Sequence, residues 1–425
     1  MKKSLCFFVC ALTLFALVPA SAFDEDHKEV INGAMLHFRV RGADRANPYI
    51  VLLHGGPGFS SHMFYTWGTR LEKSLNVVYL DQRGCGESAR LTVADPTAPK
   101  PSEIKGYTLA TLVEDIEGVR RALRVDKWYV LGHSYGGLLG VEYVAAHPEH
   151  VLGYVHMDGL VSVPRMQADI LDDAAKKITT DAAIAPTVRA LLGDQIKTLR
   201  ALPPDDPQRL FGALGLATGP GGLYFAGDQA AAFPAFLQQI GASVQPYHVP
   251  YAALAPAPEP TAALIANDHF LTRDDTPLLA RITVPTLILN GKQDGVITPR
   301  SAEAVHGLVK GSSLIEFDAC GHFPFLEQPD KAAAAVLAFT VPKKASVPGS
   351  PVAGGDRFVR VVFMVAEEGQ VTQTHVLYSS GDKAVHAAYL DAVGQLHLRP
   401  AMSDGKPRRA RVEHTFIITR KSQSP

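Results

Sequence analysis

Three side chains suited to nucleophilic catalysis occur along the chain in the order serine, aspartate, histidine. The first, Ser134, stands in the run GHSYG (132–136), which fits the pattern G-x-S-x-G and follows the apolar run 128–132. In this pattern the serine occupies a sharp turn from a strand into a helix, and the glycines leave room where the two elements nearly touch. The pattern predicts that Ser134 is a nucleophile.

A serine nucleophile needs a base that takes its proton and an acid that orients the base. Asp294 follows the apolar run 285–290, and His322 follows the next apolar run, which ends at Phe317. Alone, either residue would read as a solvated loop residue. Both, however, follow successive predicted strands, and open α/β sheets bind ligands at the carboxyl ends of their strands. We therefore expect a triad with His322 as base and Asp294 as orienting acid.

An acyl-transfer serine also needs N–H donors for the oxygen that becomes negative. One donor comes from the residue after the nucleophile, here Tyr135, and the other from the loop after an earlier strand. That loop is HGGPG (54–58), directly after the apolar run 49–53. A plain tight turn is the simpler interpretation, but so many glycines cost conformational entropy. We assign the second donor to the N–H of Gly56.

These motifs resemble those of the proline iminopeptidase (prolyl aminopeptidase) group of α/β-hydrolases. HGGPG and DQRGCGES (81–88) are the hallmark pair of that group, and GHSYG and GHFPFLEQP (321–329) also match. The resemblance covers roughly 36–160 and 284–340. It implies a serine aminopeptidase in which Ser134, Asp294 and His322 are nucleophile, acid and base. We expect no cofactor.

The resemblance also implies acidic residues that bind the free amine of the substrate, often near a Trp-Glu motif. Residues 161–283 contain no tryptophan and one glutamate, Glu259. Phe59, Asp228 and Glu259 are the candidate substrate-binding residues. A small peptide is the expected substrate, and release of N-terminal proline or another small N-terminal residue is the expected reaction. A carboxylesterase or lactonase of the same fold, acting on an ester, and a non-catalytic interaction protein remain the alternatives.

The elements that would position these residues predict an α/β-hydrolase fold. Apolar runs at 49–53, 76–80, 128–132 and 153–157 alternate with amphipathic segments such as 108–124 and 136–147. Continuous apolar strands separated by helices are typical of a parallel sheet covered on both faces. The core is predicted to comprise 23–160 and 284–341, with a last helix around 329–339. Residues 161–283 are predicted to form a helical cap, with helices at 167–178, 186–200 and 228–240.

After a Pro/Gly/Ser-rich linker, 342–355, the segment 356–425 is predicted to be a small α+β domain. Strands are expected at 358–365, 370–379 and 409–420, and a helix at 383–396. The segment 357–421 resembles the C-terminal domain of TonB-type proteins, with a strand ending in Ser-Ser-Gly and the later runs RPA and GKP. This resemblance implies a periplasmic domain that pairs edge strands with a protein partner. An appendage without a partner is the alternative.

Residues 1–22 resemble a signal peptide. Two lysines precede the apolar run 5–18, and Ala20-Ser21-Ala22 fits a small-x-small cleavage site. We expect cleavage before Phe23 and a periplasmic or secreted protein without a membrane span. An uncleaved anchor is the alternative, although a spanning helix needs about 20 apolar residues.

The composition narrows the function further. The net charge is −1 and the isoelectric point about 7.0, which does not suggest a nucleic-acid partner. The sequence shows no clustered metal-ligand spacing. Cys85 and Cys320 would remain after cleavage, and a disulfide between them is left open. Neither cysteine follows a nucleophile pattern, so packing or a redox role is expected.

Overall fold

The computed structural model describes residues 22–341, except 96–98, 183 and most of 219–250, and parts of 357–418. In the latter segment the described residues are 357–379 without 367 and 369, 401–403, 406–408 and 410–418. The predicted signal peptide (apart from its last residue) and linker lie outside the described residues. The chain divides into two compact units, residues 1–342 and 343–425.

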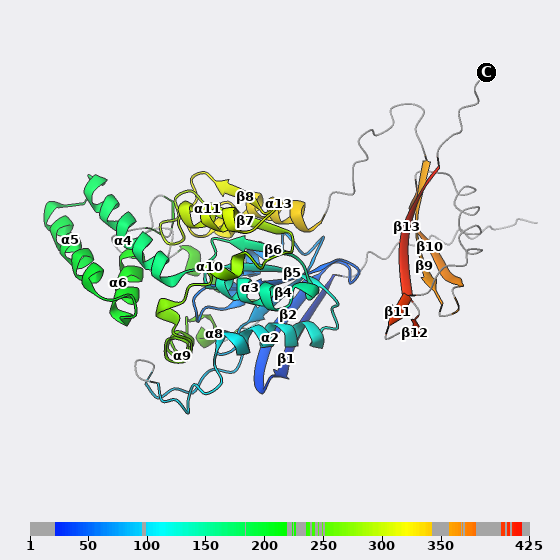
Figure 1. Cartoon of the computed structure of the whole chain (residues 1–425), viewed down its shortest axis with the longest axis horizontal. Helices are drawn as coiled ribbons and strands as arrows, with labels where there is room; N and C mark the ends of the chain where they lie inside the picture. Colours follow the sequence, from blue (N-terminus) through cyan, green and yellow to red (C-terminus); the bar gives the residue numbers. More distant parts are fainter. Residues whose placement is uncertain are drawn as a thin grey trace, which may run out of the picture. The chain divides into compact units, whose positions relative to one another are not determined.

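The first unit is built on an eight-stranded sheet of order β1-β2-β4-β3-β5-β6-β7-β8 (Figure 1). The β1–β2 and β2–β4 pairs are antiparallel, and the remaining pairs are parallel. The strands are β1 (Phe23–Ile31), β2 (Ala34–Gly42), β3 (Tyr49–Leu53), β4 (Asn76–Asp81), β5 (Trp128–His133), β6 (Val151–Met157), β7 (Thr286–Gly291) and β8 (Ser313–Phe317). The predicted α/β-hydrolase fold is confirmed. The β1–β2 hairpin was not predicted.

Helices cover both faces of this sheet, because the side chains of each central strand alternate between two hydrophobic clusters. Val51 and Leu53 pack in one cluster with α2 and α3, whereas Ile50 and Leu52 pack in the other with α1 and α13. All four side chains are fully buried. The helices outside the cap are α1 (Tyr65–Gly68), α2 (Leu109–Ala122), α3 (Tyr135–Ala146), α11 (Pro299–Leu308), α12 (Pro324–Glu327) and α13 (Pro329–Thr340).

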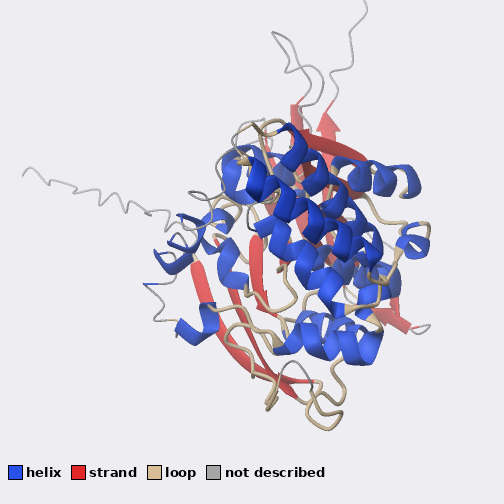
Figure 2. Cartoon of the chain, turned by 90° about the vertical axis from the view of Figure 1, so that its left-hand side faces the viewer, coloured by secondary structure: helices blue, strands red, loops and turns tan. Residues whose placement is uncertain are grey.

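A helical insertion between β6 and β7 forms the cap, which is green in Figure 1. Viewed from its side, its helices lie in front of the strands (Figure 2). The cap helices are α4 (Val163–Thr180), α5 (Pro186–Ala201), α6 (Pro207–Thr218), α8 (Tyr251–Leu254), α9 (Glu259–Asp268) and α10 (Thr276–Leu279). The predicted helices 167–178 and 186–200 lie within α4 and α5, α6 was missed, and 228–240 lies largely outside the described residues. Among the helices described, none combines the length and apolarity that crossing a bilayer requires.

The second unit contains an antiparallel three-stranded sheet of order β10-β9-β13. Its strands are β9 (Arg357–Val365), β10 (Val371–Ser379) and β13 (Ala410–Ile418), and β11 (Ala401–Ser403) pairs with β12 (Lys406–Arg408). The three strands of the sheet correspond to the three predicted ones. The predicted helix 383–396 lies outside the described residues.

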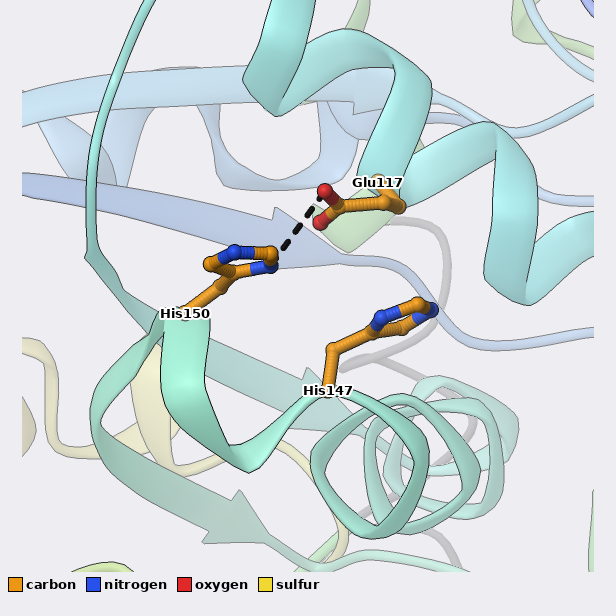
Figure 3. A group of neighbouring side chains, drawn as sticks. All are labelled: Glu117, His147 and His150. Atoms are coloured by element: carbon orange, nitrogen blue, oxygen red, sulfur yellow. Dashed lines mark ion pairs between the residues drawn. The ribbon is translucent and has the colours of Figure 1, made fainter. Parts of the chain in front are cut away.

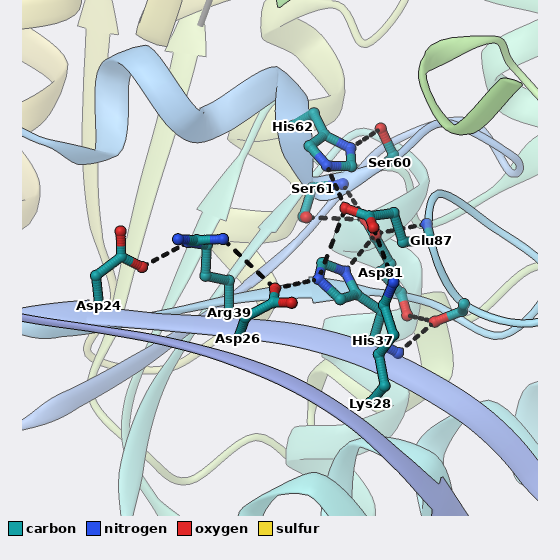
Figure 4. Close-up of polar contacts among 11 residues, drawn as sticks. Asp24, Asp26, Lys28, His37, Arg39, Ser60, Ser61, His62, Asp81 and Glu87 are labelled. Atoms are coloured by element: carbon teal, nitrogen blue, oxygen red, sulfur yellow. Dashed lines mark hydrogen bonds and ion pairs between the residues drawn. The ribbon is translucent and has the colours of Figure 1, made fainter. Parts of the chain in front are cut away.

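The buried carboxylate of Asp81, the last residue of β4, binds both the loop before this strand and the loop after it (Figure 4). Asp81 Oδ1 accepts from the N–H and the hydroxyl of Ser61, both at 2.8 Å. Asp81 Oδ2 accepts from His37 Nδ1 on β2 and from the N–H of Glu87, again at 2.8 Å. Burial opposes ionisation, but the neighbouring histidines and these donors outweigh it and hold the pKa of Asp81 well below its usual range. The loop 54–60, which ends at Ser61, is therefore anchored to the sheet.

Replacing Asp81 by Asn should lower the free energy of unfolding by about 3–5 kcal/mol at pH 7, because a buried charged acceptor is removed from its donors. Guanidinium unfolding followed by tryptophan fluorescence measures this, since the chain's two tryptophans, Trp67 and Trp128, are both buried in the first unit. Asp126→Asn, at an exposed carboxyl, is the control.

The same variant tests the pH dependence. Folding lowers the pKa of Asp81, so its stabilisation is complete above the ordinary value of about 3.9 and is lost as the pH falls below it. The difference between wild type and Asp81→Asn should therefore narrow from pH 7 to pH 3. Equal midpoints at pH 7 would contradict this role.

Candidate active site

Ser134 stands in a sharp turn between the end of β5 and the start of α3, with φ +56° and ψ −124°. Its N–H donates to the carbonyls of Met157 and Asp158, which fixes the turn against the end of β6. A Cβ at Gly136 would lie 2.1 Å from the carbonyl oxygen of Leu53, so only glycine lets α3 approach β3 this closely. The turn thus carries the serine at the carboxyl end of the central strands.

The predicted acid and base are joined by a hydrogen bond. His322 Nδ1 and Asp294 Oδ2 are 2.8 Å apart, and both side chains are buried. Asp294 Oδ1 accepts from the N–H groups of Val296 and Ile297 at 2.7 and 3.0 Å. The carboxylate is therefore fixed by its own loop and points its second oxygen at the imidazole. A histidine held through Nδ1 in this way keeps Nε2 for proton transfer.

His133 connects the serine turn to the histidine loop. Its Nε2 donates to the carbonyl oxygen of His322 at 2.8 Å, and the two rings have centroids 4.9 Å apart. Burial lowers the pKa of His133 well below its usual value, and the neighbouring His322 acts in the same direction. A neutral His133 is therefore the donor in this bond. The residue before Ser134 and the backbone of His322 are in direct contact.

The loop with the proposed oxyanion donor has a conformation that requires glycine. Gly56 has φ +124° and is exposed, and a Cβ there would lie 2.5 Å from the N–H nitrogen of Gly58. His54 ties this loop to the next one, because its Nε2 accepts from the N–H of Gln82 at 3.2 Å. Burial lowers the pKa of His54 to about 4, which keeps this acceptor neutral. Tyr135 is the first residue of α3, where N–H groups lack intrahelical acceptors.

Glu327 on α12 was not singled out from the sequence, although it stands in the GHFPFLEQP run. Its carboxylate accepts from the N–H groups of Gly321 and Phe323, on either side of His322, at 3.0–3.2 Å. The same carboxylate accepts from the N–H of Ala226 in the cap at 2.8 Å. Glu327 therefore holds the histidine loop and links it to the cap.

Aromatic side chains strengthen this link between the cap and the histidine loop. Phe323 lies 5.0 Å from Phe225 and 5.2 Å from Phe236, both in the cap, and 5.1 Å from His322 between ring centroids. Such pairs contribute about 0.5–1.5 kcal/mol each beyond their buried area. No pattern in the sequence signals the contacts with the cap, because they join residues almost 100 positions apart.

The candidate substrate-binding residues have different environments. Phe59 is half-buried beside the second hydrophobic cluster. Glu259 is half-buried at the start of α9, next to the segment whose Ala257 N–H donates to the carbonyl of Gly58 at 2.8 Å. Glu259 is thus close in sequence to the cap residue that contacts the HGGPG loop. Asp228 lies outside the described residues.

Within the part of the chain that the structure describes, two groups of side chains have the composition of metal ligands. In the first, Glu117 and His150 are 3.3 Å apart, with His147 beside them (Figure 3). Glu117 also accepts from Arg120 Nε and Nη2 and from the hydroxyl of Tyr143, so its charge is already paired. This donor set fits an ion-pair cluster better than a metal site.

The second group is Asp158, Asp294 and His322, one ligand atom of each lying within 4.8 Å of the others. Asp158, which follows β6, was not singled out from the sequence.

Cys85 and Cys320 are free and buried, so the disulfide left open above is not formed. Burial raises the pKa of both thiols far above the usual range, which disfavours either as a nucleophile.

Comparison with known families supports the two resemblances found in the sequence. A family model described as "alpha/beta hydrolase fold" matches residues 48–329. A second, described as "Gram-negative bacterial TonB protein C-terminal", matches residues 358–418.

Individual proteins similar to this chain include a proline iminopeptidase of Saccharolobus solfataricus, 26% identical over 324 residues, which are 72% of this chain and 89% of that protein. A solved proline iminopeptidase-related protein from Thermus thermophilus has a TM-score of 0.56 at 23% identity and covers 75% of this chain and 99% of its own. A proline iminopeptidase of Mycobacterium smegmatis gives 0.55 and 20%, covering 75% and 98%. Both solved structures share the fold.

Replacing Glu327 by Gln should slow catalysis by about 10²-fold, because a small misplacement of a catalytic group costs about that much. The amide cannot accept from all three backbone N–H groups, so the loop around His322 shifts. Steady-state hydrolysis of an ester or arylamide measures the effect, with Glu303→Gln, at an exposed glutamate on α11, as control. Unchanged kcat in Glu327→Gln would show that this carboxylate does not position the histidine.

Proposed function

The chain belongs to the α/β-hydrolase family, and on that premise we propose that it is a serine hydrolase that acts through an acyl-enzyme. The observation that carries the proposal is the buried hydrogen bond between His322 and Asp294. These two residues lie in loops that follow the neighbouring strands β7 and β8, and Ser134 follows β5 of the same sheet. A histidine that is oriented by a carboxylate suits the role of general base. The backbone of this histidine also accepts a hydrogen bond from His133, the residue before Ser134.

The proposed reaction has two halves. His322 Nε2 takes the proton of Ser134 as the serine oxygen attacks the substrate carbonyl, and then gives it to the leaving group. The N–H groups of Gly56 and Tyr135 donate to the negative oxygen of the tetrahedral intermediate. Water, activated by His322, then releases the acyl group. Asp294 keeps its hydrogen bond to His322 Nδ1 throughout and thereby stabilises the imidazolium.

We propose an aminopeptidase that releases N-terminal proline or another small residue as the finer activity. The support is the similarity to a proline iminopeptidase over 324 residues, together with the HGGPG and DQRGCGES runs of this chain. Glu259, half-buried near that run, is the proposed group for the substrate amine. An esterase or lactonase is the alternative that the assay below separates.

We also propose that the protein is exported and that its C-terminal unit docks a protein partner. The signal-like segment 1–22 and the match to the TonB C-terminal family support this proposal. Within the described sheet β10-β9-β13, β10 and β13 are the outer strands, and an outer strand can pair with an added one.

Hydrolysis by residues 23–425 tests the activity. The substrates are prolyl, alanyl and leucyl arylamides, an N-blocked prolyl arylamide and short p-nitrophenyl esters. The free prolyl arylamide should be cleaved and the blocked one spared, because the amine is part of the recognition. In Ser134→Ala, kcat should fall by about 10³-fold or more, since the nucleophile is lost.

Each outcome of this assay separates the alternatives. Serine-dependent cleavage of esters alone would keep the triad but reject the aminopeptidase. Equal rates in wild type and Ser134→Ala would reject the serine hydrolase. The buried variant Cys320→Ala is the matched control, because it changes the same loop as His322 without removing a proposed catalytic group.

Export is tested by expressing the full chain in a Gram-negative host and sequencing the N-terminus of the periplasmic protein. Phe23 should be the first residue. It is also the first residue of β1 and pairs with Gly42, so cleavage there leaves the β1–β2 hairpin complete. A protein that retains residues 1–22 in the membrane fraction would favour the uncleaved anchor.

A further inference from the structure

Asp158 contacts both halves of the proposed catalytic machinery. It directly follows β6 and has φ +41°, a backbone region that residues other than glycine seldom adopt. Its carbonyl accepts from the N–H of Ser134 at 3.1 Å, and its own N–H donates to the carbonyl of Leu289 in β7 at 2.8 Å. Strained backbone of this kind is retained where the surroundings enforce it, commonly at functional sites.

The Asp158 side chain is buried and only half satisfied. Oδ1 accepts from Asn290 Nδ2 at 2.8 Å and from the N–H of Gly291 at 2.9 Å. Oδ2 is also buried, and no donor among the described residues reaches it. One carboxyl oxygen of Asp158 lies within 4.8 Å of both the Asp294 carboxylate and His322. An acidic group thus stands beside the acid of the catalytic pair.

Two carboxyl groups buried this close together do not both ionise. Asp294 receives three donors, from Val296, Ile297 and His322, so both of its oxygens already act as acceptors. Asp158 Oδ2 receives none, so the proton resides there. Burial and the charge of Asp294 accordingly raise the pKa of Asp158 well above its usual value.

We propose that Asp158 is a positioning residue whose protonated Oδ2 donates a hydrogen bond to the Asp294 carboxylate and thereby holds that carboxylate on His322. This role rests on the proposed serine hydrolase mechanism. The bond satisfies the last unpaired atom of Asp158 and a remaining lone pair of Asp294. No proton leaves the pair during the reaction.

The other ionisable groups around Asp158 are consistent with its protonated form. Glu327, on α12, adds a further negative charge that disfavours ionisation of Asp158. The Cys320 thiol, in the histidine loop, stays protonated because burial raises its pKa. His322 is engaged by Asp294.

The arrangement also makes Asp158 a reserve acid. When Asp294 is replaced by Ala, the charge that keeps Asp158 protonated is gone. Asp158 can then ionise and accept from His322 Nδ1. A purely structural Asp158, which only accepts from Asn290 and Gly291, would have no such effect.

The first arm of the test is stability, which does not depend on any activity. In Asp158→Asn the amide oxygen replaces Oδ1, and the amide N–H donates where the carboxyl O–H did. Folded wild type keeps a proton that the unfolded chain releases above about pH 3.9, so wild type loses stability as the pH rises. Asp158→Asn has no such loss.

The guanidinium midpoint of Asp158→Asn should therefore exceed that of wild type at pH 8, and the difference should shrink towards pH 4.5. Tryptophan fluorescence reports the transition of the first unit. Asp169→Asn is the matched control, because Asp169 is also buried but pairs with Arg300 and accepts from Thr298. This control should lose stability at pH 8. A loss in Asp158→Asn as well would overturn the proposal.

The second arm is hydrolysis. Asp158→Ala, which removes the donor, should lower kcat by about tenfold, and the conservative Asp158→Asn, which keeps a donor, should recover part of that loss. Added to Asp294→Ala, Asp158→Asn should lower the residual rate by a further tenfold or so, a coupling typical of residues in contact. Equal effects of Asp158→Asn on the rate in the wild type and in Asp294→Ala would overturn the role of Asp158 as a reserve acid. If Ser134→Ala leaves all rates unchanged, the proposed function fails, and the stability arm still decides where the proton lies.

Discussion

The hydrogen bond from His322 to Asp294 sets the main constraint on the hydrolase unit. It buries a charged acceptor, and such a group costs several kcal/mol unless its partners are held in place. The bond also joins two separate loops, one after β7 and one after β8, so both loops have to be fixed. Glu327 fixes the histidine loop, and the N–H groups of Val296 and Ile297 fix the carboxylate.

The same constraint extends outward to the cap and to the turn that carries Ser134. Glu327 accepts from a cap N–H as well as from the histidine loop, and Phe323 packs on cap phenylalanines. The carbonyl of Asp158 accepts from the N–H of Ser134, and its side chain lies within 4.8 Å of Asp294 and His322. A displacement of the cap would therefore also shift the loop that carries His322. The cap and the loop of His322 are thus joined by a hydrogen bond and by aromatic packing.

The sequence predicted the elements whose signals are local. The central strands are apolar on both faces, and Ser134 and Asp294 each follow such a strand, whereas His322 follows the outer strand β8, which alternates between exposed and less exposed residues. The β1–β2 hairpin was missed because β1 (FDEDHKEVI) is an edge strand rich in charged side chains, which protect such edges but look like a loop in the sequence. Asp158 and Glu327 were missed because their hydrogen-bond donors include residues more than 90 positions away in the sequence, which only the folded chain brings to them. The Asp81 network depends in the same way on the pairing of β2 with β4.

The most direct test of the account is the site of covalent modification by a fluorophosphonate. Intact mass and peptide mapping of the labelled protein should give a single adduct on Ser134, and Ser134→Ala should give none under the same conditions. Prior unfolding in guanidinium should abolish labelling, because the reactivity depends on the arrangement around His322. A folded wild-type protein that stays unlabelled, or an equal adduct in Ser134→Ala, would contradict the account.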